Sequence, residues 1–175
     1  YAFAVDLAGG VVKVADVETM TPGISINTGL GTNPHGITFN PDFNAMYVTE
    51  QEGNVMYKIL FDSDPTQPDE INFVDLVQDN PDTGPRGVLG PHEALFTPDG
   101  SRYAVTCQYS NQVRFFDAAT DDLLTTIPVG AFPSELDFHA PSGLVFVTCT
   151  EDSTLNAGNP LKRGSVAVID YNTMT

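Results

Sequence analysis

The sequence predicts an all-β fold made of repeated four-stranded antiparallel units. Three segments, 34–50, 91–107 and 133–149, align with one another without a gap. Each has the pattern of strand, turn and strand, and the 3.6-residue periodicity of helices is absent. A third strand follows each segment, and a fourth strand completes the unit after the first two segments, which gives a repeat of roughly 42 residues. Four short antiparallel strands per repeat are typical of a propeller blade, so the predicted fold is a β-propeller.

Each aligned segment supplies the first two strands of a unit. Shared register positions hold phenylalanine in the first strand and a Val-Thr pair in the second: Phe39, Phe96 and Phe138, then Val48-Thr49, Val105-Thr106 and Val147-Thr148. Between the two strands lie sequences such as Pro41-Asp42 and Pro98-Asp99-Gly100. These favour tight turns, because Pro presets φ, Asp binds nearby backbone and Gly accepts a positive φ.

The third and fourth strands of each unit are also evident. Third strands are predicted at Val12–Asp16, Val55–Ile59, Val113–Asp117 and Val166–Asp170. Fourth strands are predicted at Gly23–Asn27, Ile71–Asp75 and Leu123–Ile127. The chain therefore divides into a partial blade (1–33), two complete blades (34–90 and 91–132) and a second partial blade (133–175). Propellers close with about four to eight blades, so we expect the remaining blades in the same or another chain.

Several of these motifs match one repeat family. The elements Pro34-His35-Gly36, Tyr47-Val48-Thr49-Glu50 and the junction Thr126–Pro133 resemble the YVTN-type β-propeller repeat. The resemblance implies a ring of about seven blades and a periplasmic, cell-surface or secreted location. It extends to the propeller parts of cytochrome d1-like and nitrous-oxide-reductase-like proteins, of sugar lactonases and of noncatalytic surface proteins, so the fold leaves the function open.

Charge argues against some classes of partner, and the positions of the cysteines argue against a disulfide. The formal net charge is −16, from 7 basic and 23 acidic residues. Such a surface repels phosphate backbones, so nucleic acid is not an expected partner. No apolar run approaches the roughly 18 residues that span a bilayer. Cys107 and Cys149 occupy equivalent positions in adjacent blades, too far apart for a disulfide, and are predicted to be free, buried thiols.

Blade topology indicates which face carries a site. The entry to strand one and the loop between strands two and three lie on one face, which we call the channel-mouth face. His35, His92, Glu93 and Glu135 stand at entries to strand one and are expected to ring the channel. Two insertions, 80–90 with Arg86 and 151–164, are predicted on the same face, where loops on a rigid scaffold commonly carry function.

These residue types suit two kinds of chemistry. Imidazoles of His35 and His92 would bind copper, zinc or a haem iron. The alternative is a structural role, because two histidines do not make a metal site. Glu93 and Glu135 with Arg86 would suit a lactonase-like or carbohydrate site, in which carboxylates activate water and Arg stabilises an anion. Here the alternative is ion pairs between blades or a solvated rim.

The preferred hypothesis is a noncatalytic extracytoplasmic scaffold or binding domain of a larger protein, because the structural motifs are present without a complete catalytic set. It predicts a protein or small-molecule ligand at the channel mouth and no cofactor. The first alternative is a redox subunit with copper or haem at His35 and His92. The second alternative is a lactonase-like hydrolase, so whether the protein is an enzyme stays open.

Overall fold

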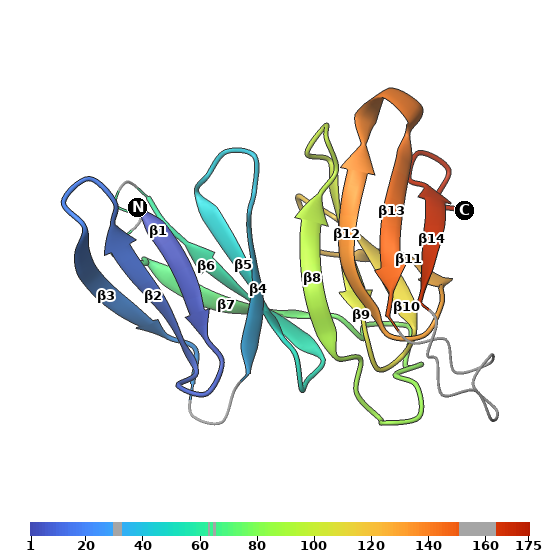
Figure 1. Cartoon of the computed structure of the whole chain (residues 1–175), viewed down its shortest axis with the longest axis horizontal. Helices are drawn as coiled ribbons and strands as arrows, with labels where there is room; N and C mark the ends of the chain where they lie inside the picture. Colours follow the sequence, from blue (N-terminus) through green and yellow to red (C-terminus); the bar gives the residue numbers. More distant parts are fainter. Residues whose placement is uncertain (30–32, 63, 65, 151–163) are drawn as a thin grey trace.

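A computed structural model describes residues 1–29, 33–62, 64, 66–150 and 164–175 (Figure 1). In these ranges the chain forms four antiparallel sheets of three or four strands. The described residues include no α-helix, and a single 3-10 turn, η1, spans Ala140–Ser142. The prediction of an all-β fold made of propeller blades, some of them partial, is confirmed. None of the described helical structure is long or apolar enough to cross a membrane.

The strands follow one another in sequence order within each sheet. The first sheet contains β1 (Ala2–Asp6), β2 (Val11–Asp16) and β3 (Thr21–Asn27). The second contains β4 (Pro34–Phe39), β5 (Ala45–Glu50), β6 (Val55–Leu60) and β7 (Glu70–Asp75). The third contains β8 (Pro91–Phe96), β9 (Arg102–Cys107), β10 (Gln112–Asp117) and β11 (Leu123–Pro128). The fourth contains β12 (Pro133–His139), β13 (Leu144–Cys149) and β14 (Ser165–Asp170).

Hydrophobic cores fill the spaces between neighbouring sheets. Val48 and Ile59 belong to the core between the first and second sheets, and Tyr103 and Phe116 to the core between the second and third. The central strand β5 is buried at every position, because it packs against a sheet on each side. Strands buried on both faces carry continuous apolar runs, which explains the Ala-Met-Tyr-Val sequence of β5.

The strand ends fall on the two predicted faces. The first strands of the three later blades, β4, β8 and β12, lie side by side, with their starts at the lower edge of Figure 1. Segment 76–90 loops below this edge, whereas the tight turns that follow β4, β8 and β12 lie at the upper edge. The lower edge is therefore the channel-mouth face. The predicted insertion 151–164 lies outside the described residues except for Gly164.

Segment 76–90 is anchored by one buried arginine on the next blade. Arg114 of β10 is 0% exposed. Its guanidinium donates hydrogen bonds to four backbone carbonyls of the segment, those of Leu76 (2.8 Å), Val77 (3.2 Å), Asn80 (3.1 Å) and Asp82 (2.7 Å). A side chain with five donors in a fixed fork can satisfy several carbonyls at once, so Arg114 fixes the course of this segment.

Candidate functional site

The first strand of each of the three later blades, which we call the inner strand, carries a β-bulge at the candidate residues. On β8, Pro91 pairs with Cys107 and Ala94 pairs with Val105. His92 and Glu93 therefore both lie opposite the single residue Thr106. The same two-against-one pairing places His35-Gly36 opposite Thr49 on β4 and Ser134-Glu135 opposite Thr148 on β12. A bulge breaks the strict alternation of a strand, so two consecutive side chains need not point to opposite faces.

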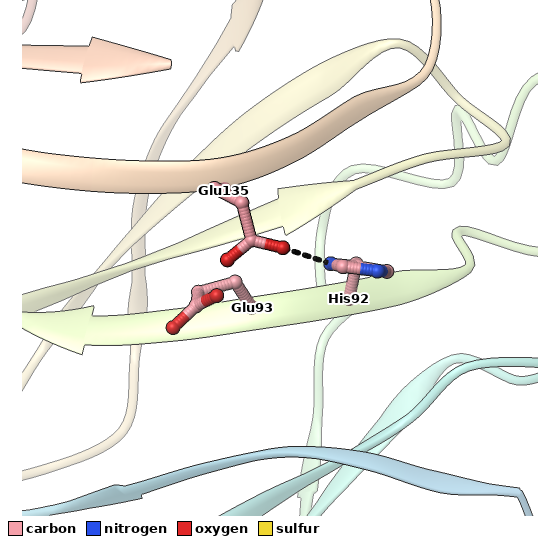
Figure 2. A group of neighbouring side chains, drawn as sticks. All are labelled: His92, Glu93 and Glu135. Carbon is pink, nitrogen blue, oxygen red and sulfur yellow. Dashed lines mark ion pairs between the residues drawn. The ribbon is translucent and has the colours of Figure 1, made fainter. Parts of the chain in front are cut away.

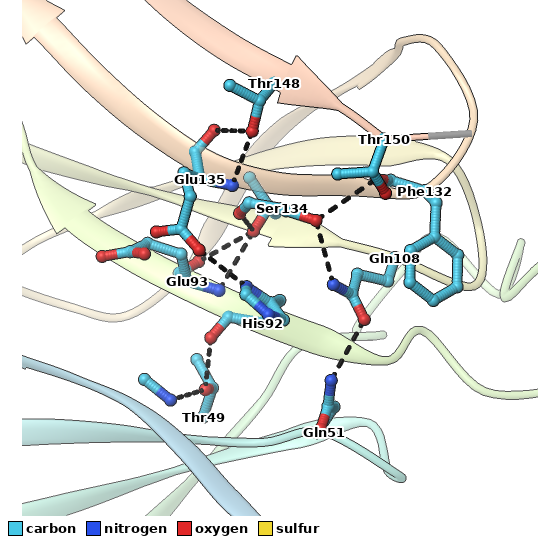
Figure 3. Close-up of polar contacts among 12 residues, drawn as sticks. Thr49, Gln51, His92, Glu93, Gln108, Phe132, Ser134, Glu135, Thr148 and Thr150 are labelled. Carbon is cyan, nitrogen blue, oxygen red and sulfur yellow. Dashed lines mark hydrogen bonds and ion pairs between the residues drawn. The ribbon is translucent and has the colours of Figure 1, made fainter. Parts of the chain in front are cut away.

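The threonine of the Val-Thr pair holds each bulge, and Thr49 and Thr106 also join their bulges to the next blade (Figure 3). Thr106 Oγ1 accepts a hydrogen bond from the Glu93 N–H at 3.0 Å and donates to the Ser134 carbonyl at 2.7 Å. Thr49 Oγ1 likewise accepts from the Gly36 N–H at 2.7 Å and donates to the His92 carbonyl at 2.8 Å. The repeated threonine therefore sets both the bulge and the spacing between inner strands.

Replacing Thr106 with valine, which has the same shape, is expected to lower the free energy of unfolding by about 1–2 kcal/mol, because a partly buried N–H and a buried carbonyl each lose their partner. Urea unfolding measures the change. Thr148→Val is the matched control, since Thr148 holds the same repeat position but is exposed, and it should cost less than about 0.5 kcal/mol. Equal losses in the two variants would contradict the proposed role of Thr106.

The bulges bring four side chains together at the channel mouth, and we call His35, His92, Glu93 and Glu135 the channel-mouth cluster. The rings of His35 and His92 contact each other, with centroids 4.0 Å apart and an interplanar angle of 39°. His92 Nδ1 lies 3.8 Å from Glu135 Oε1 (Figure 2). One ligand atom from each of His92, Glu93 and Glu135 lies within 4.8 Å of the others. The cluster thus draws on three neighbouring blades.

Burial and crowding shift the protonation of this cluster. Burial and the nearby Glu135 carboxylate raise the pKa of Glu93 to about 8. Burial and the neighbouring His35 lower the pKa of His92, against the opposing effect of Glu135. In the described part of the chain, Nδ1 of both imidazoles is buried without a hydrogen-bond partner. At neutral pH the cluster therefore contains a protonated Glu93 and a neutral His92, and among the described residues neither Nδ1 atom has a hydrogen-bond partner.

The raised pKa of Glu93 predicts a loss of stability in alkali. Its contribution is complete below the ordinary pKa of 4.5 and is lost as pH rises toward about 8, since the folded state binds the proton more tightly than the unfolded state. Glu93 is half-buried, so we expect a loss of about 1–2 kcal/mol rather than the full value of the shift. Urea unfolding at pH 5 and pH 9 with EDTA should show this loss in the native chain and not in Glu93→Gln. Identical pH profiles would contradict it.

Arg86 lies in a separate group of side chains. Its guanidinium packs over the Tyr109 ring, 4.0 Å from the centroid, and the Tyr109 hydroxyl donates to Glu52 Oε1 at 2.6 Å. Among the described residues no ion pair joins Arg86 to Glu93 or Glu135. In the described structure the Arg86 guanidinium therefore packs on Tyr109 and makes no ion pair with the two carboxylates of the cluster.

A row of hydrogen-bonded polar side chains lies beside the cluster, and the sequence analysis did not predict it. Gln51 donates to Gln108 Oε1 at 3.1 Å, and Gln108 donates to Ser134 Oγ at 3.2 Å (Figure 3). The three residues come from three successive blades, and Gln108 is only 3% exposed. The signal in the sequence was a glutamine directly after the second strand in two repeats. These hydrogen bonds help to fix the relative positions of the blades that contain β8 and β12.

The cysteines behave as predicted. Cys107 and Cys149 are both free and buried. Burial raises the pKa of the Cys107 thiol to about 12 and also raises that of Cys149. Both thiols are therefore protonated at neutral pH and act as small apolar side chains, because the thiolate is the reactive form.

Comparison with known proteins identifies the fold. No protein-family model and no curated protein matches this sequence. Among solved structures, the chain is similar to hydrazine synthase of Kuenenia stuttgartiensis, with a TM-score of 0.74 and 17% identity over 98% of this chain and 43% of that one. It is also similar to a putative 6-phosphogluconolactonase of Bacteroides uniformis, with a TM-score of 0.68 and 16% identity over 99% and 54% of the two chains.

A third similar structure is the Cps50 (Swd1) β-propeller domain of Myceliophteria thermophila, with a TM-score of 0.60 and 14% identity over 80% of this chain and 42% of that one. The chain thus spans about half the length of the structures that it matches. These proteins differ in function and share little sequence with the chain. The similarity establishes a propeller fold, and function has to be argued from the site.

Proposed function

We propose that this chain is a noncatalytic binding domain of a larger extracytoplasmic protein, and that its channel-mouth face holds a positively charged group of a protein or small-molecule partner. The supporting observation is the channel-mouth cluster, in which the carboxylates of Glu93 and Glu135 lie close together (Figure 2) and no described Lys or Arg pairs with them. The net charge of −16 attracts cations to the molecule as a whole. The YVTN-type resemblance supports the extracytoplasmic setting.

Selection of phage-displayed random peptides against the purified protein tests this function. We expect enrichment of peptides containing Lys or Arg, and roughly tenfold weaker binding of those peptides to the double variant Glu93→Gln/Glu135→Gln. Glu18→Gln/Glu70→Gln is the matched control, because it makes the same two substitutions at exposed positions elsewhere. Equal affinity for the two double variants, or no enrichment, would overturn the proposed site.

A redox subunit is the second candidate, and the contact between His35 and His92 favours it. Two imidazoles from adjacent blades, 4.0 Å apart at their centroids, offer nitrogen donors of the kind that copper and haem iron take. Elemental analysis and an absorption spectrum of protein purified without chelator test the idea. Stoichiometric copper or a haem band would support it. Absence of both, in the native chain and in His35→Ala and His92→Ala alike, would overturn it.

A further inference from the structure

We propose that His92, Glu93 and Glu135 bind a divalent transition-metal cation of the zinc type. This inference rests on the proposed function, because it specifies the positively charged ligand of the same site. The site takes two of its ligands from the bulge of β8 and one from the bulge of β12, and their donor atoms lie within 4.8 Å of one another (Figure 2). Without the bulge, His92 and Glu93 would point to opposite faces of the strand.

The donor set indicates which cation fits. One imidazole nitrogen and two carboxylate oxygens suit zinc and similar divalent transition metals, whereas calcium and magnesium take oxygen ligands alone. His92 Nδ1 is buried without a hydrogen-bond partner among the described residues, so no hydrogen bond competes with a metal for this nitrogen. Three protein ligands leave a fourth coordination position for water or for a group of the partner.

The side chains need only a small movement to close around a metal. Ligand atoms of a tetrahedral zinc site lie about 3.3 Å apart, given metal–ligand bonds of about 2.0–2.1 Å. The Glu135 side chain is 64% exposed and can rotate inward, whereas the His92 side chain is 12% exposed and is held by its ring contact with His35. His35 is thus a positioning residue that sets the orientation of His92, and it is not itself a ligand.

Charge favours the same occupant. Glu93 and Glu135 lie together without a Lys or Arg ion pair in the described part of the chain, and Arg86 is held on Tyr109. Two carboxylates side by side disfavour each other's ionisation. A divalent cation between them binds the ionised form of both and also accepts the electron pair of an imidazole nitrogen, so one ion serves all three side chains.

Isothermal titration with zinc chloride tests the proposal, on protein that has been stripped with EDTA and dialysed. We expect one saturable zinc ion per chain, and binding weakened roughly tenfold or more in Glu135→Gln and in His92→Gln. Glu135 is exposed, so Glu135→Gln should fold normally. It therefore still tests the site if His92→Gln fails to fold. Glu18→Gln and His139→Gln are the matched controls and should bind as the native chain does.

Cobalt(II) provides a second readout. A visible absorption band at one equivalent of cobalt, lost in Glu135→Gln, would support coordination by this cluster. Unsaturable binding, or equal affinity in Glu135→Gln and Glu18→Gln, would assign the zinc to the acidic surface at large and overturn the proposal. If zinc fails while Lys- or Arg-containing peptides still bind through Glu93 and Glu135, the metal site is wrong and the proposed binding function stands.

Discussion

Replacing Arg114 with methionine is expected to lower the free energy of unfolding by about 3–5 kcal/mol. The side chain is fully buried, and its hydrogen bonds satisfy four carbonyls between Leu76 and Asp82 as well as Gln112 Oε1. Methionine fills much of the same volume but donates nothing. The carbonyls would then be buried without partners, at a cost of about 1–3 kcal/mol for each one that water cannot reach.

Urea unfolding of the native chain and Arg114→Met measures this loss. Arg102→Met is the control, because Arg102 donates one hydrogen bond, to the Tyr171 carbonyl at 3.1 Å, and its replacement should cost about 1 kcal/mol. Limited proteolysis adds a local readout, since segment 76–90 should be cleaved faster in Arg114→Met. Equal stability of the two variants, together with an unchanged cleavage rate, would show that Arg114 does not anchor the segment.

Replacing Gly36 with alanine is expected to lower the free energy of unfolding by about 2–3 kcal/mol, through overpacking against backbone. A Cβ at this position would lie 2.5 Å from the His92 carbonyl oxygen and 3.2 Å from Thr49 Oγ1. The carbonyl belongs to the neighbouring inner strand and is itself bonded to Thr49, so it cannot move without separating the two blades. The glycine of the Pro-His-Gly motif is therefore required by close approach between blades.

Gly9→Ala is the matched control for this substitution. Its Cβ would meet the Asp6 side chain at 2.7 Å, but that side chain is partly exposed and can rotate away, so the loss should stay below about 1 kcal/mol. Thermal or urea unfolding compares the two variants. If Gly36→Ala were no less stable than Gly9→Ala, the inner strands β4 and β8 would have to be less closely packed than the structure shows.

The strands were predictable because the repeat fixes their order and their turns. The third strand predicted at Val113–Asp117 is observed as Gln112–Asp117, and the fourth strand predicted at Leu123–Ile127 is observed as Leu123–Pro128. The prediction left out residues at the strand ends, because hydrogen bonds to neighbouring strands decide where a strand ends and the side-chain pattern does not show them. Burial of Arg114 was not predicted, since its partners are carbonyls of a segment on another blade.

The composition of the channel-mouth cluster was predictable, whereas its geometry was not. Topology alone placed His35, His92, Glu93 and Glu135 at the entries of inner strands. Regular alternation, however, would send His92 and Glu93 to opposite faces, and only the two-against-one pairing with Thr106 brings them together. The repeated threonine was visible in the sequence as part of the motif, but its hydrogen bonds to the next blade depend on how the blades stack.

The hydrogen bonds that hold the bulges do not involve the side chains that the bulges present at the channel mouth. In 92–93 and 134–135, a side-chain hydroxyl of the neighbouring strand satisfies the backbone of the second residue, whatever side chain that residue carries. Evolution or a protein engineer can therefore exchange the displayed side chains one blade at a time while the sheets stay intact. Gly36 is the exception, so substitutions that change the channel-mouth side chains should be made in the bulges of β8 and β12 and not at Gly36 of β4.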